Sequence, residues 1–351
     1  MKSLFIMGAA GSGKTAVALG LALKMQEEGF RVAYFKPVGS SARPGLPDAD
    51  ALLMRQALSM EVPLETIVPC TAGPSYLSRN LPKDRLAAIK DSYREVSRGA
   101  DCVIVDGASF PHVLAASGLD SVSLAGEFGA VALNVIRVKN DFSLDLAVFF
   151  NRYLADRGVP SAGNLFSHVE RSLQAKIEGV YRPILDGLGY RTAGIIPLRT
   201  EIALPTVGEY FDVLGGEILA GEERLGLLVE EVVVGAMTIE SALSYLRRTT
   251  NKAVVIGGDR ADLALAALET STSALILTGG LYPDVKVLAR AAEKGVPVIL
   301  VHYDTYATVE KMAAVSRHLK PGDQQGIRLA LENIEHYCDW QGILQVLKEQ
   351  E

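Results

Sequence analysis

The sequence has few cysteines and no long apolar run. Its 351 residues include three cysteines, Cys70, Cys102 and Cys338, which are widely spaced and show no metal-ligand pattern. Such cysteines are typical of free thiols in a reducing compartment. No apolar run approaches the roughly 18 residues that a membrane span requires, and the apolar stretch at 2–7 is too short for a signal peptide. We therefore expect a cytoplasmic protein with no membrane partner.

An excess of basic residues is also lacking. Lysine and arginine number 35 against 41 aspartates and glutamates, which gives a net charge of -6. A basic surface is the usual footprint of a nucleic-acid-binding protein, so we expect no nucleic-acid partner. The content of 49% hydrophobic and 22% charged residues is typical of a globular protein, and the length suits two domains.

Strand and helix patterns alternate along the chain. Apolar strands are expected at 2–7, 31–39, 101–109, 130–138 and 193–198, with helices at 13–29, 48–58, 82–98 and 141–158. This alternation is typical of an α/β fold, with a parallel sheet covered by helices on both faces. A second alternating set follows. We expect one domain at 1–204, a smaller α/β domain at 205–315 and a tail of two short helices at 316–351.

The segment GAAGSGKT at 8–15 fits the phosphate-loop pattern G-x-x-x-x-G-K-[ST], between an apolar strand and a helix. Its glycines let backbone N–H groups turn toward an anion, and the helix directs its positive dipole end there. Lys14 would reach the outer phosphates of a nucleotide, and the Thr15 hydroxyl would ligate Mg²⁺. The alternative is a glycine turn beside a solvent-exposed lysine. The expected nucleotide-binding residues are Gly8, Gly11, Ser12, Gly13, Lys14, Thr15 and Ala16.

Further polar residues lie where the phosphate loop would need them. Asp106 ends an apolar strand, where it could hold Mg²⁺ directly or through water, or could simply start the next turn. Lys36 follows the second strand close to the same crevice, although a lysine there is often a surface charge. Asp48 is a candidate N-cap, and Asp50 is a candidate second acid facing the metal.

Four segments, in this order, resemble dethiobiotin synthetase and its relatives, which include the cobyrinic acid a,c-diamide synthase group. They are GAAGSGKT at 8–15, FKPVGSS at 35–41, DADALLM at 48–54 and VDGAS at 105–109. The likeness is greatest to the dethiobiotin-synthetase-like N-terminal region of long bacterial phosphate acetyltransferases. It implies a P-loop NTPase fold with ATP and Mg²⁺ as cofactors.

The resemblance also implies a role for each matched side chain. Lys14 would bind the phosphates, and Lys36 would contact the reacting carboxylate or carbamate, so both are implied catalytic residues. The implied magnesium ligands are Thr15, Asp50 and Asp106. Pro197 lies in GIIPL at 194–198, which resembles the segment whose backbone borders the base.

The sequence departs from the synthetases at several positions. The loop interior reads AAGS at 9–12, where synthetases usually carry acidic and threonine residues, and Asp106 replaces a glutamate. Ser167 falls near the place of the asparagine that contacts adenine, so ATP and GTP both remain open. GASFPH at 107–112 does not repeat the glycine-rich stretch of the diamine pocket. These departures affect the ligase reaction more than nucleotide binding.

The second half resembles the DRTGG domain, a regulatory module found beside phosphate acetyltransferase and some pyrophosphatase catalytic parts. The matching segments are GDR at 258–260, TGG at 278–280 and DT at 304–305, with VVVGAMT at 232–238 upstream. Both glycine pairs follow apolar strands, where open α/β sheets bind ligands, although they could only permit tight turns. The resemblance implies a homodimer with a small-molecule effector site.

Three functions are consistent with these features. The first is a metabolic regulator that binds Mg-ATP, and the DRTGG pairing and altered substrate pocket favour it. The second is an ATP-dependent ligase acting through a phosphorylated carboxylate or carbamate, favoured by the retention of Lys36, Asp50 and Asp106. The third, a scaffold with a relic phosphate loop, fits poorly with the intact Lys14 and Thr15. Since the sequence ends without the acyltransferase domain of the long enzymes, we do not expect acetyl transfer.

Overall fold

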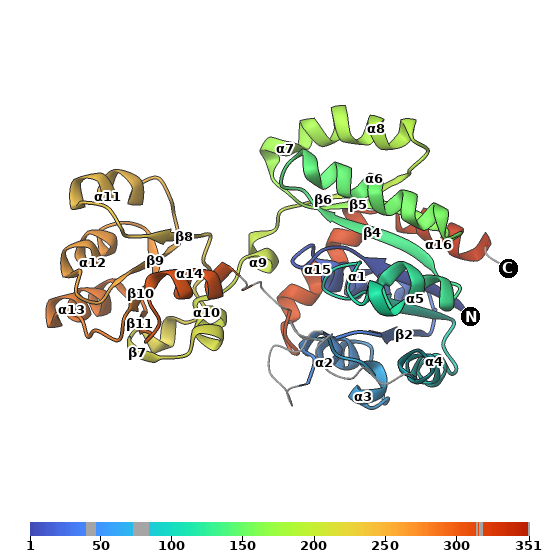
Figure 1. Ribbon diagram of the computed structural model, residues 1–351, viewed down its shortest axis with the longest axis horizontal. Helices are drawn as coiled ribbons and strands as arrows, with labels where there is room; N and C mark the ends of the chain where they lie inside the picture. The colour runs from blue at the N-terminus through green and yellow to red at the C-terminus, as the bar shows by residue number, and fades with distance from the viewer. Residues whose placement is uncertain (40–46, 73–83, 314, 316–318, 350–351) are drawn as a thin grey trace. The chain divides into compact units, whose positions relative to one another are not determined.

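The computed structural model describes residues 1–39, 47–72, 84–313, 315 and 319–349 (Figure 1). The chain divides into two compact units. The first contains Met1–Arg199 together with Leu319–Glu351, and the second contains Thr200–His318. Each unit has its own sheet and its own buried core.

The first unit is built on six parallel strands in the order β2-β3-β1-β4-β5-β6. Their bounds are β1 Lys2–Met7, β2 Val32–Phe35, β3 Cys102–Asp106, β4 Val131–Arg137, β5 Ser161–Val169 and β6 Thr192–Pro197. The central strands are buried along almost their whole length, which explains their continuous apolar sequences. In the register of β1 and β3, Ile6 pairs with Asp106, so the phosphate loop and this carboxylate leave the sheet at the same edge.

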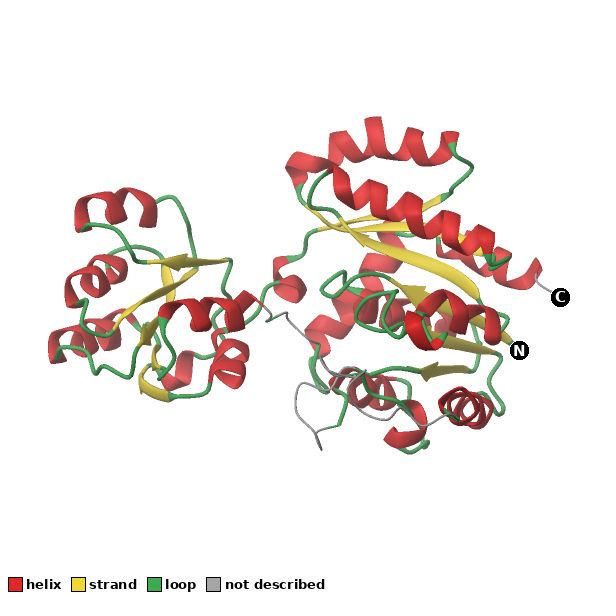
Figure 2. Cartoon of the chain, viewed as in Figure 1, coloured by secondary structure: helices red, strands yellow, loops and turns green. Residues whose placement is uncertain are grey.

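Helices cover both faces of this sheet (Figure 2). Their bounds are α1 Lys14–Glu27, α2 Ala49–Ala57, α3 Leu64–Ile67, α4 Arg85–Val96, α5 Ser121–Glu127, α6 Asp141–Asp156, α7 Arg171–Lys176 and α8 Arg182–Gly187, with α15 Gln324–Tyr337 and α16 Trp340–Glu349. Phe5 and Met7 pack into one core with side chains of α4, α5 and α6. Helices α1, α15 and α16 contact the strands as well. The predicted helix at 82–98 is α4, and residues 82 and 83 lie outside the described residues.

The C-terminal residues complete the first unit. From the sequence, we expected residues 316–351 to form a tail of two short helices. Two helices, α15 and α16, lie in this range. Helix α15 packs along α1, and Gly20 of α1 comes so close to it that a Cβ there would lie 2.4 Å from the Ala330 carbonyl oxygen. At Gly194 of β6, a Cβ would lie 2.2 Å from the Tyr337 carbonyl oxygen. These close backbone approaches bind residues far apart in sequence into one core.

The second unit has a five-stranded sheet in the order β7-β11-β10-β9-β8. The strands are β7 Glu217–Ala220, β8 Glu231–Val234, β9 Lys252–Gly257, β10 Thr272–Thr278 and β11 Val298–Leu300, and β7 alone is antiparallel to its neighbour. The helices are α9 Thr200–Ala203, α10 Val207–Leu214, α11 Ile239–Leu246, α12 Ala261–Leu268, α13 Val285–Lys294 and α14 Thr305–Ala313. Side chains of α11, α12 and α13 fill one core and those of α10 and α14 another. The predicted fold class, a parallel sheet between helices followed by a smaller α/β domain, is confirmed.

No helix in the described part of the chain combines the length and the apolar character needed to cross a membrane.

Replacement of Gly20 tests the packing of α15 on α1. Alanine is the better helix former by about 1 kcal/mol, but overpacking against the Ala330 carbonyl costs about 1–3 kcal/mol. We therefore expect Gly20→Ala to lower the free energy of unfolding, measured by urea denaturation. Gly126→Ala is the matched control, because the new Cβ in α5 would lie 3.7 Å from Val159, an ordinary contact. Equal stabilisation by both substitutions would contradict this packing.

Candidate functional site

The phosphate loop connects β1 to α1. Gly11 and Gly13 have φ angles of 69° and 79°, conformations that most residues with side chains avoid. Gly8 passes so close to β4 that a Cβ there would lie 2.3 Å from the Val135 carbonyl oxygen. The Ser12 hydroxyl is fully buried and has no hydrogen-bond partner among the described residues. The glycines therefore fix the loop's shape, and Ser12 leaves an unused hydrogen-bonding group inside it.

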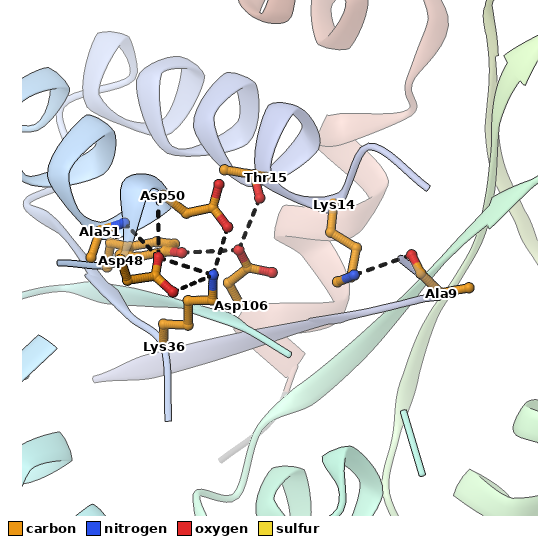
Figure 3. Close-up of polar contacts among 9 residues, drawn as sticks. Ala9, Lys14, Thr15, Lys36, Asp48, Asp50, Ala51 and Asp106 are labelled. Carbon is orange, nitrogen blue, oxygen red and sulfur yellow. Dashed lines mark hydrogen bonds and ion pairs between the residues drawn. The ribbon is translucent and has the colours of Figure 1, made fainter. Parts of the chain in front are cut away.

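Lys14 closes this loop. It is the first residue of α1, and its ammonium donates a hydrogen bond to the Ala9 carbonyl oxygen at 3.2 Å (Figure 3). Burial lowers the pKa of Lys14 below its ordinary value, although Asp106 and Asp50 attract its charge. A buried ammonium with a lowered pKa is stabilised by a further nearby anion. The arrangement thus suits a phosphate in the loop.

Thr15 meets Asp106, which ends β3. The Thr15 hydroxyl donates to Asp106 Oδ2 at 3.2 Å, and the Tyr34 hydroxyl of β2 donates to the same oxygen at 2.9 Å. Burial raises the pKa of the Asp106 carboxyl, whereas Lys36 and Lys14 oppose this effect through their charges. Asp106 therefore does more than begin a turn, because its side chain connects β3 to the phosphate-loop helix and to β2.

Lys36 lies between two carboxylates of the α2 N-terminus. Its ammonium is 3.0 Å from Asp48 and 2.5 Å from Asp50, and all three side chains are at most 15% exposed. Burial by itself would lower the pKa of Lys36, but Asp50, Asp106 and Asp48 together raise it. Asp48 also caps α2 by accepting from the backbone N–H groups of Asp50 and Ala51. Lys36 is therefore a buried ion-pair partner, which removes the surface-charge alternative.

The donor set fits Mg²⁺ bound together with a nucleotide. Among the described residues, Asp106 Oδ1 is buried and has no hydrogen-bond partner, and it belongs to the same carboxylate as the oxygen that Thr15 contacts. Hard oxygen ligands of this kind suit Mg²⁺, which usually keeps waters and shares substrate phosphates. Across the described ranges, no three His, Cys, Asp or Glu side chains are grouped to hold a metal by themselves. A metal here would need phosphate oxygens or water as additional ligands.

The net charge of the ionisable side chains around Asp106 also favours a bound cation. When ionised, Lys14 and Lys36 supply two positive charges against three negative charges from Asp48, Asp50 and Asp106, so an added cation would be stabilised. The assignment of Thr15, Asp50 and Asp106 as metal ligands remains a prediction. Asp50 is in contact with Lys36, so metal ligation by its Oδ2 atom would require that contact to change.

The end of β5 supports the phosphate loop. The Ser167 hydroxyl donates to the Ser12 carbonyl oxygen at 2.7 Å. His168 has a φ of 54°, and its ring lies 2.9 Å from the position that a Cβ on Gly13 would occupy. Burial, assisted by the charge of Arg137, lowers the pKa of His168 to about 4. Ser167, expected near a base-reading position, is thus engaged with the loop backbone.

The predicted site residues fall into two groups. Lys14, Thr15, Lys36, Asp50 and Asp106 influence one another's charge or are in contact, and Ala16 lies in the first turn of α1. Pro197 ends β6, which is separated from β1 by β4 and β5. Its place beside a base remains a prediction. Ser40 and Ser41 of the predicted segment 35–41 lie outside the described residues.

Sequence reasoning missed two residues. Tyr34 is fully buried in β2 and reaches Asp106, and His168 adopts a left-handed conformation against the loop. A tyrosine in an apolar strand usually indicates core packing, and a single histidine carries no signal of its backbone conformation. The position of each residue in the sequence was the one usable signal. Tyr34 lies two residues before Lys36 and therefore on the same strand face, and His168 directly follows Ser167.

The motif residues of the second unit gather at the carboxyl ends of its strands. Thr278 Oγ1 lies 3.0 Å from Thr305 Oγ1, and the Asp304 side chain accepts from the Ala307 N–H. A Cβ on Gly258 would lie 1.8 Å from the Leu281 carbonyl oxygen. Close backbone approach thus explains this glycine, which supports the tight-turn interpretation there. An effector site at this edge remains a prediction.

His168 predicts an acid-sensitive part of the stability. Because its pKa is about 4 in the folded protein against 6.5 ordinarily, the unfolded chain binds a proton that the folded chain does not between these values. The free energy of unfolding should therefore fall as pH drops from 6.5 to 4. His168→Asn, which tolerates positive φ, should flatten this fall in urea unfolding at pH 7 and pH 5. The exposed His336→Asn is the control, and parallel losses in all three proteins would contradict the assignment.

Comparison with known proteins gives two family matches. The sequence profile of an AAA domain family, AAA_26, matches residues 2–206, and that of the DRTGG domain matches residues 209–315. The chain is 22% identical to phosphate acetyltransferase of Pseudomonas putida over an alignment of 352 positions, gaps included, which covers 94% of the chain and 49% of that enzyme. It is 26% identical to hydrogenobyrinate a,c-diamide synthase of Rhodobacter capsulatus over 241 residues, covering 67% of the chain and 49% of that enzyme.

The chain thus spans about half the length of these curated relatives. Among solved structures, it resembles the CBS and DRTGG domains of the regulatory region of Clostridium perfringens pyrophosphatase complexed with the activator diadenosine tetraphosphate. That likeness has 17% identity and a TM-score of 0.28, and it covers 48% of this chain and 87% of the other. The expected pairing of a dethiobiotin-synthetase-like domain with a DRTGG domain is confirmed. The profile of the AAA domain family matches residues 2–206, more than half of the 351 residues, so the chain belongs to that AAA domain family. The chain also carries a DRTGG domain.

Proposed function

We propose that this protein is a cytoplasmic, nucleotide-dependent metabolic regulator. Its first unit binds Mg-ATP at the phosphate loop, and its DRTGG domain forms a homodimer and binds a small-molecule effector. The observation that carries the proposal is the state of Lys36, whose charge is already neutralised by Asp48 and Asp50 in a buried site. A ligase would need this charge for its substrate, whereas a nucleotide-binding regulator would not.

Nucleotide binding is supported by the geometry of the loop. Gly8, Gly11 and Gly13 fix its backbone, and Lys14 is held across it by the Ala9 carbonyl. The Thr15 hydroxyl and the Asp106 carboxylate, which are in contact, supply oxygen atoms that would hold Mg²⁺. In this role Mg²⁺ would neutralise phosphate charge, and the chain's own residues would position it.

The Lys36 ion pairs favour regulation over ligation on energetic grounds. Breaking a buried ion pair by removing one partner costs about 3–5 kcal/mol, because the other charge is left uncompensated. A substrate carboxylate that recruited Lys36 would have to compete with both Asp48 and Asp50 at distances of 2.5–3.0 Å. The three side chains are better described as a stable structural unit that anchors the α2 N-terminus to β2.

A ligase is the second candidate, and one observation favours it. Lys36, Asp50, Asp106 and Lys14 occupy one charge cluster, as a site that brings a carboxylate to a nucleotide would require. A substrate carboxylate or carbamate oxygen would attack the γ-phosphorus and expel ADP, giving a mixed anhydride. An amine would then capture the carbonyl carbon and release phosphate. Lys14 would neutralise charge on the transferred group.

Nucleotide binding at the loop is tested with Lys14→Ala. Loss of a hydrogen-bonding charge costs about 1.5–3 kcal/mol, so we expect Kd for ATP with Mg²⁺ to rise about 10- to 100-fold. Calorimetric titration with ATP and with GTP measures this and also identifies the preferred base. Lys90→Ala is the control, since it removes an exposed lysine that pairs only with Glu127 among its described contacts. Equal affinities for wild type and Lys14→Ala would refute binding at this loop.

Turnover separates the two candidates. ADP release is measured with Mg-ATP alone and with bicarbonate, a panel of diamines and a panel of carboxylates, using Lys14→Ala as the blank. If the protein is a regulator, we expect negligible ADP release, and no added compound should increase it. A severalfold rise with one compound, lost in the blank, would overturn the regulator and establish the ligase.

A further inference from the structure

Tyr34 is a buried tyrosine that makes a polar contact at the centre of the site. Its side chain is fully buried in β2, and its hydroxyl donates to Asp106 Oδ2 at 2.9 Å. In the register of the two strands, Tyr34 pairs with Ile104, two residues before Asp106 on β3. Residues two apart on a strand face the same side, so the ring lies along the sheet face toward the carboxylate. The hydroxyl is thus placed by the sheet itself.

The two oxygens of Asp106 have different surroundings. Oδ2 accepts from both the Thr15 and Tyr34 hydroxyls, whereas Oδ1 is buried without a partner in the described structure. A buried carboxylate oxygen that accepts nothing is costly unless a cation or donor arrives. Two donors on Oδ2 therefore fix the carboxylate rotation and keep Oδ1 available.

The contact between the buried Tyr34 hydroxyl and Asp106 can be explained by packing or by function. Buried tyrosines usually find a partner for their hydroxyl, and packing alone could explain the Tyr34 contact. The functional explanation rests on what the hydroxyl contacts. The Tyr34 hydroxyl and the hydroxyl of Thr15, at the end of the phosphate loop, both contact Asp106 Oδ2. Partners that orient a metal ligand typically change metal affinity by about 10- to 100-fold when removed.

We propose that Tyr34 is a positioning residue for the divalent cation that accompanies the nucleotide. By holding Asp106 Oδ2, it presents Oδ1 to the cation, directly or through a water molecule. Tyr34 acts through Asp106 and does not touch nucleotide or metal itself. The inference rests on the proposed Mg-nucleotide site and adds a residue that the phosphate-loop motif does not contain.

The test separates metal-dependent from metal-independent binding. Kd for ATP is measured by calorimetry with excess Mg²⁺ and with EDTA, for wild type, Tyr34→Phe and Tyr93→Phe. Tyr93 is the matched control, a largely buried tyrosine of α4 whose hydroxyl contacts Ser3. In wild type we expect Mg²⁺ to tighten binding. Tyr34→Phe should reduce this Mg²⁺ effect about tenfold and leave Kd in EDTA within about twofold, while Tyr93→Phe leaves both unchanged.

A second measurement follows the metal directly. Mn²⁺ bound in the presence of ATP is counted by electron paramagnetic resonance, and Tyr34→Phe should require about tenfold more Mn²⁺ for half-saturation. Melting temperatures of all three proteins report whether the substitutions disturb the fold. Equal weakening with Mg²⁺ and with EDTA, or no change in either, would overturn the role of Tyr34. Absence of ATP binding by the wild type would instead overturn the proposed function together with this inference.

Discussion

The site depends on one buried carboxylate. Asp106 ends β3 with no exposed surface, and the parallel pairing of β3 with β1 and β2 brings it beside the phosphate-loop helix and Tyr34. Burial raises its pKa, so its negative charge is stable only near cations or hydrogen-bond donors. Lys14, Lys36, Thr15 and Tyr34 surround it in this way. The chemistry of the site is therefore set by sheet register, which fixes where Asp106 lies, as much as by the loop motif.

In the proposed function, the neighbouring Lys36 decides between nucleotide binding alone and ligation. Its ion pairs with Asp48 and Asp50 join β2 to the N-terminus of α2 and occupy the charge that a substrate carboxylate would need. A site can thus retain the residues of a ligase and still favour nucleotide binding alone. In the proposed regulator the energy of binding would serve conformational coupling to the DRTGG domain, which requires two states with different affinities. In the sequence, the second unit is inserted between Arg199 and Leu319 of the first.

Much of the fold could be predicted from the sequence, because its signals are local. Apolar strands, amphipathic helices and the GAAGSGKT segment predicted the parallel sheet and the loop. Lys36, Asp50 and Asp106, which the motifs singled out, lie together. Contacts set by long-range packing were not predictable in this way. The C-terminal helices return to the first unit through Gly20 and Gly194, which carry no local signal of their distant partners. Tyr34 and His168 were missed because their roles depend on neighbouring strands and on backbone conformation.

The most direct measurement is a crystal structure of the full chain with Mg²⁺ and a non-hydrolysable ATP analogue. We expect triphosphate density in the loop within contact of Lys14, with a metal ion coordinated by Thr15 and by Asp106, directly or through water. We also expect Lys36 to keep its contacts with Asp48 and Asp50. A nucleotide bound away from the loop, or a metal ion that contacts neither Thr15 nor Asp106, would contradict the account.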